Sequence, residues 1–368
     1  MKKATLLGGE DVIYSALGIK EEAFNEQFHH YLREKFSDYR SKQSPVDYGK
    51  EVALPAKYRQ IFSQAVSPDA SQFVVMTSNR DDYEFDILKI DRAGKVIDNL
   101  TGGSTTSYEY LTTDSFTFEG RNLSWSANGA RIAYFARTGK LRSLFVLDAA
   151  DGDLVKKIKL KIDQAGSPAL SPDGRRVVIT GFLEGKPDLF LIDIETEAIS
   201  HLTNDILYEK SPIWSKDGKW LYYTTRVRSR DQIMRMDPSN SKAVEQITSS
   251  DYDSTSPYYD AESNSIYYAA NKGGAYNIYR LDLNTGDKLQ FTDTIGSNFS
   301  PIVFHEGGKE TIAFTSFFKG QYRFFIMDLP QPMTIIAKGS EEAGEGTLKP
   351  TSEQLAKKFG APGATVPT

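Results

Sequence analysis

Few side chains in this sequence are placed so that they could act together in catalysis. The 368-residue chain has no cysteine and four histidines, His29, His30, His201 and His305. His29 and His30 are neighbours on an expected helix, where they would point about 100° apart, a poor geometry for binding one metal. His305-Glu306 is followed by Gly-Gly-Lys and lacks the second histidine of the His-Glu-x-x-His zinc motif. Since no Gly-x-Ser-x-Gly nucleophile motif occurs either, the sequence predicts no metal, no cofactor and no catalytic residue.

Carboxylates are the remaining source of chemistry, because the chain has 49 Asp and Glu residues. Six aspartates each end an apolar run, at Asp91, Asp148, Asp193, Asp237, Asp282 and Asp328. A ring of six carboxylates would suggest a metal, yet each stands where a strand gives way to a turn, and there aspartate accepts hydrogen bonds from turn N–H groups. We therefore expect these residues to stabilise turns. A stand-alone hydrolase that uses other carboxylates is the weakest of the functional alternatives.

The elements that carry these residues recur along the chain. Turn-rich segments of the Ser-Pro-Asp-Gly kind begin at six positions, Ser67, Ser126, Ser171, Ser215, Asp260 and His305. Their spacings are 59, 45, 44, 45 and 45 residues, and the six aspartates repeat with nearly the same period. A repeat of about 45 residues made of short strands is typical of propeller blades. The predicted fold is all-β, a six-bladed β-propeller with a short α-helical N-terminal extension.

Four segments follow from this reading. Residues 1–45 are expected to be helical, 46–60 to be a connector, 61–338 to form the six blades and 339–368 to be a flexible tail rich in Gly, Pro and Glu. The helical prediction depends on one apolar stripe with a period near 3.6 residues, made of Phe24, Phe28, Tyr31, Leu32 and Phe36.

Two features of the propeller segment stay open at this stage. The first repeat is longer by an insertion around residues 102–120, which is either a binding loop or an extended hairpin. The outer strand of the sixth blade comes either from residues 333–337 or from the connector near Val52.

Composition excludes several classes of partner. The formal net charge is −5 and no basic stripe is present, so nucleic acid is not an expected partner. No run of about 18 apolar residues would span a membrane. The N-terminal apolar stretch is broken by Gly8, Gly9, Glu10 and Asp11, so it is not read as a signal peptide, and an export signal would lie outside this chain.

The loops that enter the innermost strands form the candidate binding surface. Aligned on the repeat, they offer three pairs of residues, Tyr208 and Glu209, Tyr252 and Asp253, and Asn298 and Phe299. Aromatic rings beside polar groups suit a protein interface. The alternative is that these side chains only close the ends of the blades.

The repeat itself resembles the TolB-type propeller family. The resemblance rests on SPDGRRVVITGFLEGKPDLFLIDIETEAISHLTND, on SPIWSKDGKWLYYTT with QIMRMD and QITSS, and on SPYYDAESNSIYYAANKGGAYNIYRLD. It covers about residues 61–338 and implies a non-catalytic scaffold that binds a protein or peptide, in the periplasm or outside the cell. Such propellers also occur as non-catalytic parts of larger peptidases.

A second resemblance concerns the segment VIYSALGIKEEAFNEQFHHYLREKF near the N-terminus. It is similar to the last helix of peptidase-MA-type zinc metallohydrolases, which in some bacterial proteins precedes a TolB-like propeller. The zinc-binding helix of that family is absent from this chain. The alternative function is therefore the propeller part of a larger exported zinc peptidase, with an attached or associated peptidase domain as partner.

Overall fold

The computed structural model describes residues 18–37, 42–47, 49–81, 84–101, 109–111, 121–205, 207–329, 332 and 334–336. The chain separates into two compact units, one of residues 1–42 with 343–368 and one of residues 43–342. The predicted insertion at 102–120 lies largely outside the described residues, as does the predicted tail at 339–368.

The first unit contains helix α2 (Glu21–Lys35), as the 3.6-residue stripe predicts. Glu21 and Glu22 lie in its first turn and Arg33 and Lys35 in its last, which complements the helix dipole. The Phe24 and Phe28 rings stack with their centroids 5.8 Å apart. No residue of α2 is buried, and the helix is not long and apolar enough to span a membrane, nor is any other helix in the described part of the chain.

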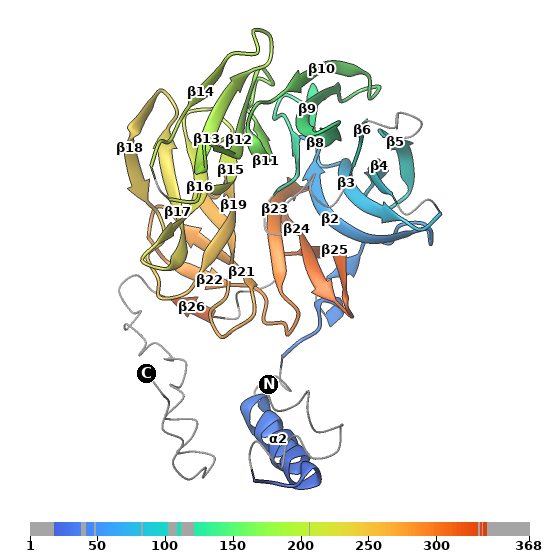
Figure 1. The fold of residues 1–368 in the computed structure, drawn as a ribbon, viewed down its shortest axis with the longest axis vertical. Helices are drawn as coiled ribbons and strands as arrows, with labels where there is room; N and C mark the ends of the chain where they lie inside the picture. The colour runs from blue at the N-terminus through green and yellow to red at the C-terminus, as the bar shows by residue number, and fades with distance from the viewer. Residues whose placement is uncertain are drawn as a thin grey trace. The chain divides into compact units, whose positions relative to one another are not determined.

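The second unit confirms the predicted six-bladed β-propeller (Figure 1). A short 3-10 helix, η2 (Pro45–Asp47), precedes it. The first blade consists of β2 (Tyr58–Val66), β3 (Gln72–Asn79), β4 (Phe85–Asp91) and β5 (Val96–Asn99). The second blade consists of β6 (Glu109–Tyr110), β7 (Leu123–Trp125), β8 (Arg131–Thr138), β9 (Leu141–Asp148) and β10 (Leu154–Lys159). The third blade consists of β11 (Asp163–Leu170), β12 (Arg176–Leu183), β13 (Lys186–Asp193) and β14 (Ile199–His201).

The other three blades follow the same antiparallel order. The fourth consists of β15 (Lys210–Trp214), β16 (Leu221–Val227), β17 (Arg230–Asp237) and β18 (Asn240–Gln246). The fifth consists of β19 (Ser254–Asp260), β20 (Ser265–Ala270), β21 (Asn277–Asp282), β22 (Lys288–Gln290) and β26 (Thr334–Ile336). The sixth consists of β23 (Asn298–Glu306), β24 (Lys309–Phe318), β25 (Gln321–Asp328) and β1 (Lys50–Glu51).

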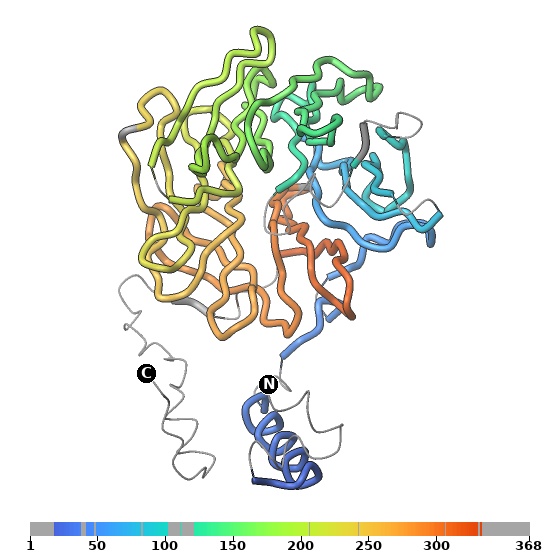
Figure 2. The backbone as a smooth tube through the Cα atoms, viewed as in Figure 1, coloured from blue at the N-terminus to red at the C-terminus, as the bar shows by residue number. Residues whose placement is uncertain are grey.

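The ring closes through the N-terminal side of the chain. Strand β1 pairs with β25, so that segments from opposite ends of the propeller sequence lie side by side (Figure 2). The Val52 N–H donates to the Phe324 carbonyl at 2.8 Å, and Glu51 forms an ion pair with Arg323 at 2.6 Å. Strand β26, the other candidate for this position, pairs instead with β22 at the edge of the fifth blade. Part of the expected connector is therefore a strand of the sixth blade.

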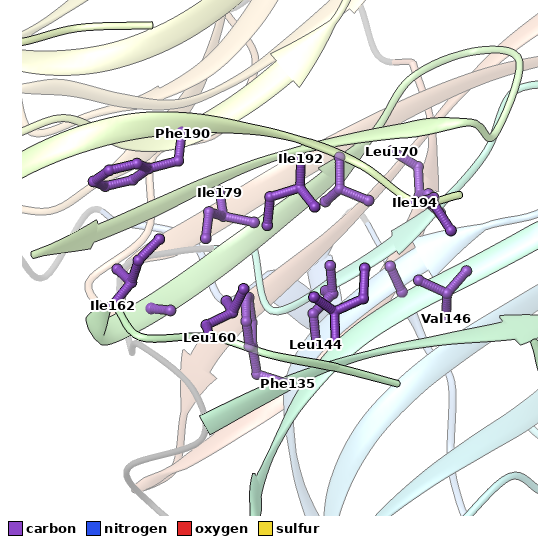
Figure 3. Packing of buried hydrophobic residues seen from close by; sticks show 14 residues of the cluster. Phe135, Leu144, Val146, Leu160, Ile162, Leu170, Ile179, Phe190, Ile192 and Ile194 are labelled. Carbon is purple, nitrogen blue, oxygen red and sulfur yellow. The ribbon is translucent and has the colours of Figure 1, made fainter. Parts of the chain in front are cut away.

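The core is built between neighbouring blades. The middle strands carry continuous buried runs, such as Val177, Val178 and Ile179 in β12, because both faces of each sheet are covered. Figure 3 shows one such layer, in which Phe190 and Ile192 of the third blade face Leu144 and other residues of the second.

Repeated turns hold the blades in shape, and five of the six strand-ending aspartates act in them as predicted. Asp91, Asp148, Asp193, Asp237 and Asp282 each accept at least one turn N–H, at 2.8–3.1 Å. The Ser-x-Asp turns have a second network. The Ser171 hydroxyl donates to Asp173 at 2.5 Å and accepts from the Arg176 N–H at 2.9 Å, and the same pattern recurs from Ser67 and Ser215.

The Ser-Pro pairs of the repeat make a bulge in the innermost strand. The serines of four such pairs, Ser167, Ser211, Ser256 and Ser300, have positive φ, and the strand register shifts at each of them. The following proline has no N–H to donate, so the ladder is interrupted there and a bulge relieves the mismatch. This bulge turns backbone carbonyls toward the centre of the ring, as the Arg121 contacts described below show.

Candidate functional site

A cavity of about 310 Å³ lies where the innermost strands of all six blades end. Each blade contributes residues from the end of its first strand and from the turn that follows, so the cavity is centred on the propeller axis. A concave site with apolar walls and a few polar groups is the usual form of a ligand pocket.

The walls of the cavity are rich in aromatic rings. Trp125 and Trp214 stand at equivalent positions in the second and fourth blades, immediately before the turn serine, and Tyr259 and Phe304 line the fifth and sixth. Two indoles are fixed by hydrogen bonds, since Trp214 Nε1 donates to the Ala169 carbonyl at 3.0 Å and Trp125 Nε1 to the Gly129 carbonyl at 3.2 Å. The rings are therefore held in place before any ligand arrives.

The mouth of the cavity carries a cluster of one histidine and two carboxylates between the fifth and sixth blades. His305 Nε2 lies 3.0 Å from Asp260 Oδ1, and His305 Nδ1 lies 3.3 Å from Glu262 Oε2. Hydrogen bonds from Ser263 and the contact with His305 hold the pKa of Asp260 below its usual range despite burial.

Among the described residues, one set of three potential metal ligands comes close together, Asp260, His305 and Glu310, with ligand atoms within 4.8 Å. Asp260 accepts from Ser263, and Glu310 accepts from the Tyr267 hydroxyl. Since each carboxylate is occupied by a protein donor, we assign no metal to this set. His305 and Glu306 lie in strand β23, not on the helix that a His-Glu-x-x-His motif requires.

Arg121 lies at the inner end of the cavity. It precedes β7 and is further from the turns along its strand than the other lining residues. Its side chain is 6% exposed, and Nη2 reaches the carbonyls of Pro301 at 2.7 Å and of Pro257 at 3.2 Å. One guanidinium thus joins the second blade to the fifth and sixth. Burial lowers the pKa of Arg121 to about 10, so the group is still charged at neutral pH.

The six residues predicted as a binding surface lie at the opposite ends of the innermost strands, and three are buried. Asn298 is fully buried and donates to Thr292 and Thr294 at 3.0 Å. Tyr252 is 7% exposed and Glu209 is 2% exposed. These three side chains are therefore part of the packing in the described structure.

The other three predicted residues are more accessible. Tyr208 is 42% exposed and packs on Phe182 with ring centroids 5.8 Å apart. Phe299 is half-buried against Tyr276 at 5.2 Å. Asp253 accepts from Asn271 Nδ2 at 2.8 Å and lies 3.9 Å from Arg230. Tyr208 and Phe299 keep the ring surface that the predicted interface needs.

Sequence reasoning did not identify Arg121, Trp125 or Trp214. A signal for Arg121 was present, because the second blade has Asn122-Leu123 where four other blades have Ser-Pro, and an arginine precedes this departure. The two tryptophans could have been found from their shared position before the turn serine.

The fold and its central cavity define the class of protein, a six-bladed β-propeller with a preformed pocket on its axis. Residues 122–251 match the family model described as the TolB beta propeller domain. The match covers most of the second blade and all of the third and fourth, which include part of the segment whose motifs resemble TolB-type repeats.

Curated proteins with similar sequences include TolB proteins. The chain is 26% identical over 161 residues to the Protein TolB homolog of Chlorobium luteolum, covering 44% of this chain and 36% of that protein. It is 27% identical over 157 residues to the Tol-Pal system protein TolB of Bordetella pertussis, covering 43% of this chain and 36% of the relative. The matched segment thus spans about a third of each relative.

One solved structure shares the fold over most of both chains. It is described as putative TolB from Agrobacterium tumefaciens and has a TM-score of 0.50 and 16% sequence identity. The likeness covers 74% of this chain and 91% of that one.

Proposed function

We propose that this propeller is a non-catalytic binding module that takes an extended segment of a protein or peptide into its axial cavity. The observation that carries this proposal is the pocket itself, which is built by six blades and lined by the half-buried Trp125 and Tyr259 and by the buried Trp214 and Phe304. Rigid aromatic rings supply large contact area at low entropic cost, and such rings dominate binding energy at protein interfaces. The resemblance to TolB proteins supports a peptide or protein as the ligand and a periplasmic location, which cell fractionation would test.

The proposal predicts that a bulky residue at the mouth blocks binding. Ala261 lines the mouth and is exposed, so Ala261→Trp adds a ring without disturbing the core. Peptides selected from a random display library on the full chain should bind this variant at least about tenfold more weakly, because the added ring excludes the peptide from at least one major contact in the cavity.

A matched control is available on the same side of the propeller. Ala198 lies in the turn before β14, is exposed and does not line the cavity, so Ala198→Trp should bind the selected peptides as the parent does. Equal binding to all three proteins would place the ligand elsewhere and contradict the proposal.

The predicted entry-loop surface is a second candidate for the same function. The exposed ring of Tyr208 and the half-buried ring of Phe299 support it. Tyr208→Ala would abolish binding without lowering the melting temperature if this surface holds the partner. Unchanged binding to that variant would remove the surface from consideration.

A further inference from the structure

The guanidinium of Arg121 has donors that the protein does not satisfy. Arginine has five N–H donors, of which Nη2 carries two. Nη2 is used by the carbonyls of Pro301, Pro257 and Ser256, the last at 3.4 Å. Among the described residues Nε is buried without any hydrogen-bond partner, and no hydrogen bond is formed by Nη1. Three donors of a buried cation are therefore open.

The charge of Arg121 is also unbalanced by the described part of the chain. None of its ion pairs includes Arg121, and the contacts to the guanidinium are neutral carbonyls and the face of Tyr258, whose ring centroid is 5.7 Å away. A buried charge normally has an opposite charge or a full set of hydrogen bonds, so this position calls for an anion or for water.

The charges that face Arg121 across the cavity are at the mouth and have partners of their own. Asp69 accepts from Ser67 and Ser71. Asp260 and Glu262 both contact His305, which lies between them. Lys216 is the remaining charged residue in the lining. The inner end of the cavity thus combines the Arg121 cation with backbone carbonyls and with apolar residues such as Pro212 and Ile302, whereas the mouth carries three acids.

We propose that Arg121 binds a single carboxylate of the segment that enters the cavity, either a C-terminal carboxylate or an acidic side chain. This inference rests on the proposed function and adds the chemical group that the pocket selects. A charge-assisted hydrogen bond to Arg121 Nη1 is the interaction that the open donor offers. The three acids at the mouth and the backbone carbonyls around Arg121 disfavour a polyanion, so a segment with a single carboxylate fits best.

The test compares three short probes on the full chain by calorimetry and by the fluorescence of the cavity tryptophans. The probes are N-acetyl-leucyl-leucine as the free acid, the same dipeptide as its C-terminal amide, and N-acetyl-glutamyl-leucine amide. We expect the free acid to bind about 10- to 100-fold more tightly than the amide, the range for a hydrogen bond to a charged group. Binding by the glutamyl amide would identify an acidic side chain as sufficient, and its failure would identify the C-terminus as the group recognised.

Arg121→Met keeps much of the aliphatic volume and removes the charge, so it should make free acid and amide equivalent. Because Arg121 joins three blades, its replacement could unfold the protein, so the melting temperature of the Arg121→Met variant is measured first. Ala198→Trp serves as the folded control. If Arg121→Met does not fold, the comparison of acid and amide binding to the parent chain still tests whether the cavity recognises a carboxylate.

Equal binding of acid and amide to the parent would overturn the carboxylate inference and leave the peptide-binding function standing. Absence of binding by every probe at millimolar concentration would show that water alone satisfies the open donors, which also overturns it. The proposed function is tested separately, by whether the selected peptides bind the parent chain and lose affinity for Ala261→Trp.

Discussion

At the scale of single residues, the described part of the chain contains two side chains, one basic and one acidic, that are buried with an unsatisfied polar atom and without an ion-pair partner. Arg121 is one, at the inner end of the cavity. Glu209, at the opposite end of the innermost strands, is the other, since its Oε2 atom is buried without a hydrogen-bond partner. Burial, reinforced by the nearby charges of Asp205 and Asp188, raises the pKa of Glu209 to about 8. Glu209 was predicted from its position as an interface residue, but its environment is that of an interior acid.

The raised pKa predicts a pH dependence of stability. An acid whose pKa is near 4.5 in the unfolded chain and about 8 in the folded one binds its proton more tightly when folded. Its contribution to stability is therefore present below about pH 4.5 and is lost as the pH rises toward 8. Glu209→Gln should raise the free energy of unfolding by roughly 4 kcal/mol at pH 8 and leave it nearly unchanged at pH 4.5.

Urea unfolding at the two pH values measures this difference. Glu195 is exposed, so Glu195→Gln is the matched control and should show no such change with pH. A Glu209→Gln variant that is destabilised equally at both values would contradict a role for ionisation.

At the scale of elements, the blades depend on short repeated networks and on one strand borrowed from the other end of the chain. Strand β1 and Val52 complete the sixth blade, and Val52 is 4% exposed in the core between the sixth and first blades. Strand β26 only extends the outer edge of the fifth blade. Loss of these two segments should therefore have very different consequences.

Two N-terminal truncations test this closure. A chain beginning at Gly49 keeps β1, whereas a chain beginning at Ala53 lacks β1 and Val52. The second should be less stable by about 3 kcal/mol, because it loses one buried aliphatic side chain and a few backbone hydrogen bonds. Thermal melting should show the loss, and a chain that ends at Leu329, without β26, should melt closer to the parent. Equal melting of the two N-terminal truncations would contradict closure by β1.

At the scale of the whole molecule, the 45-residue repeat made the propeller predictable. Arg121, the central residue of the candidate site, lies where the second blade departs from that repeat. The spacing of the turn serines and strand-ending aspartates follows from local turn chemistry, which one sequence reveals. The choice of closing strand does not follow from local turn chemistry, because Lys50 pairs with Ile326, a residue at the other end of the propeller sequence. The role of Arg121 was not predicted because it depends on contacts with the carbonyls of Pro257 and Pro301, which belong to blades far away in sequence.

The central claim is that a peptide enters the cavity on the propeller axis. Hydrogen–deuterium exchange of the full chain, with and without a peptide selected on it, tests this most directly. We predict added protection in the segments that line the cavity, 66–70, 125–127, 213–216 and 258–262. Protection confined to the entry loops at 207–209, 252–253 and 298–299 would contradict the claim and assign the partner to the opposite side of the propeller.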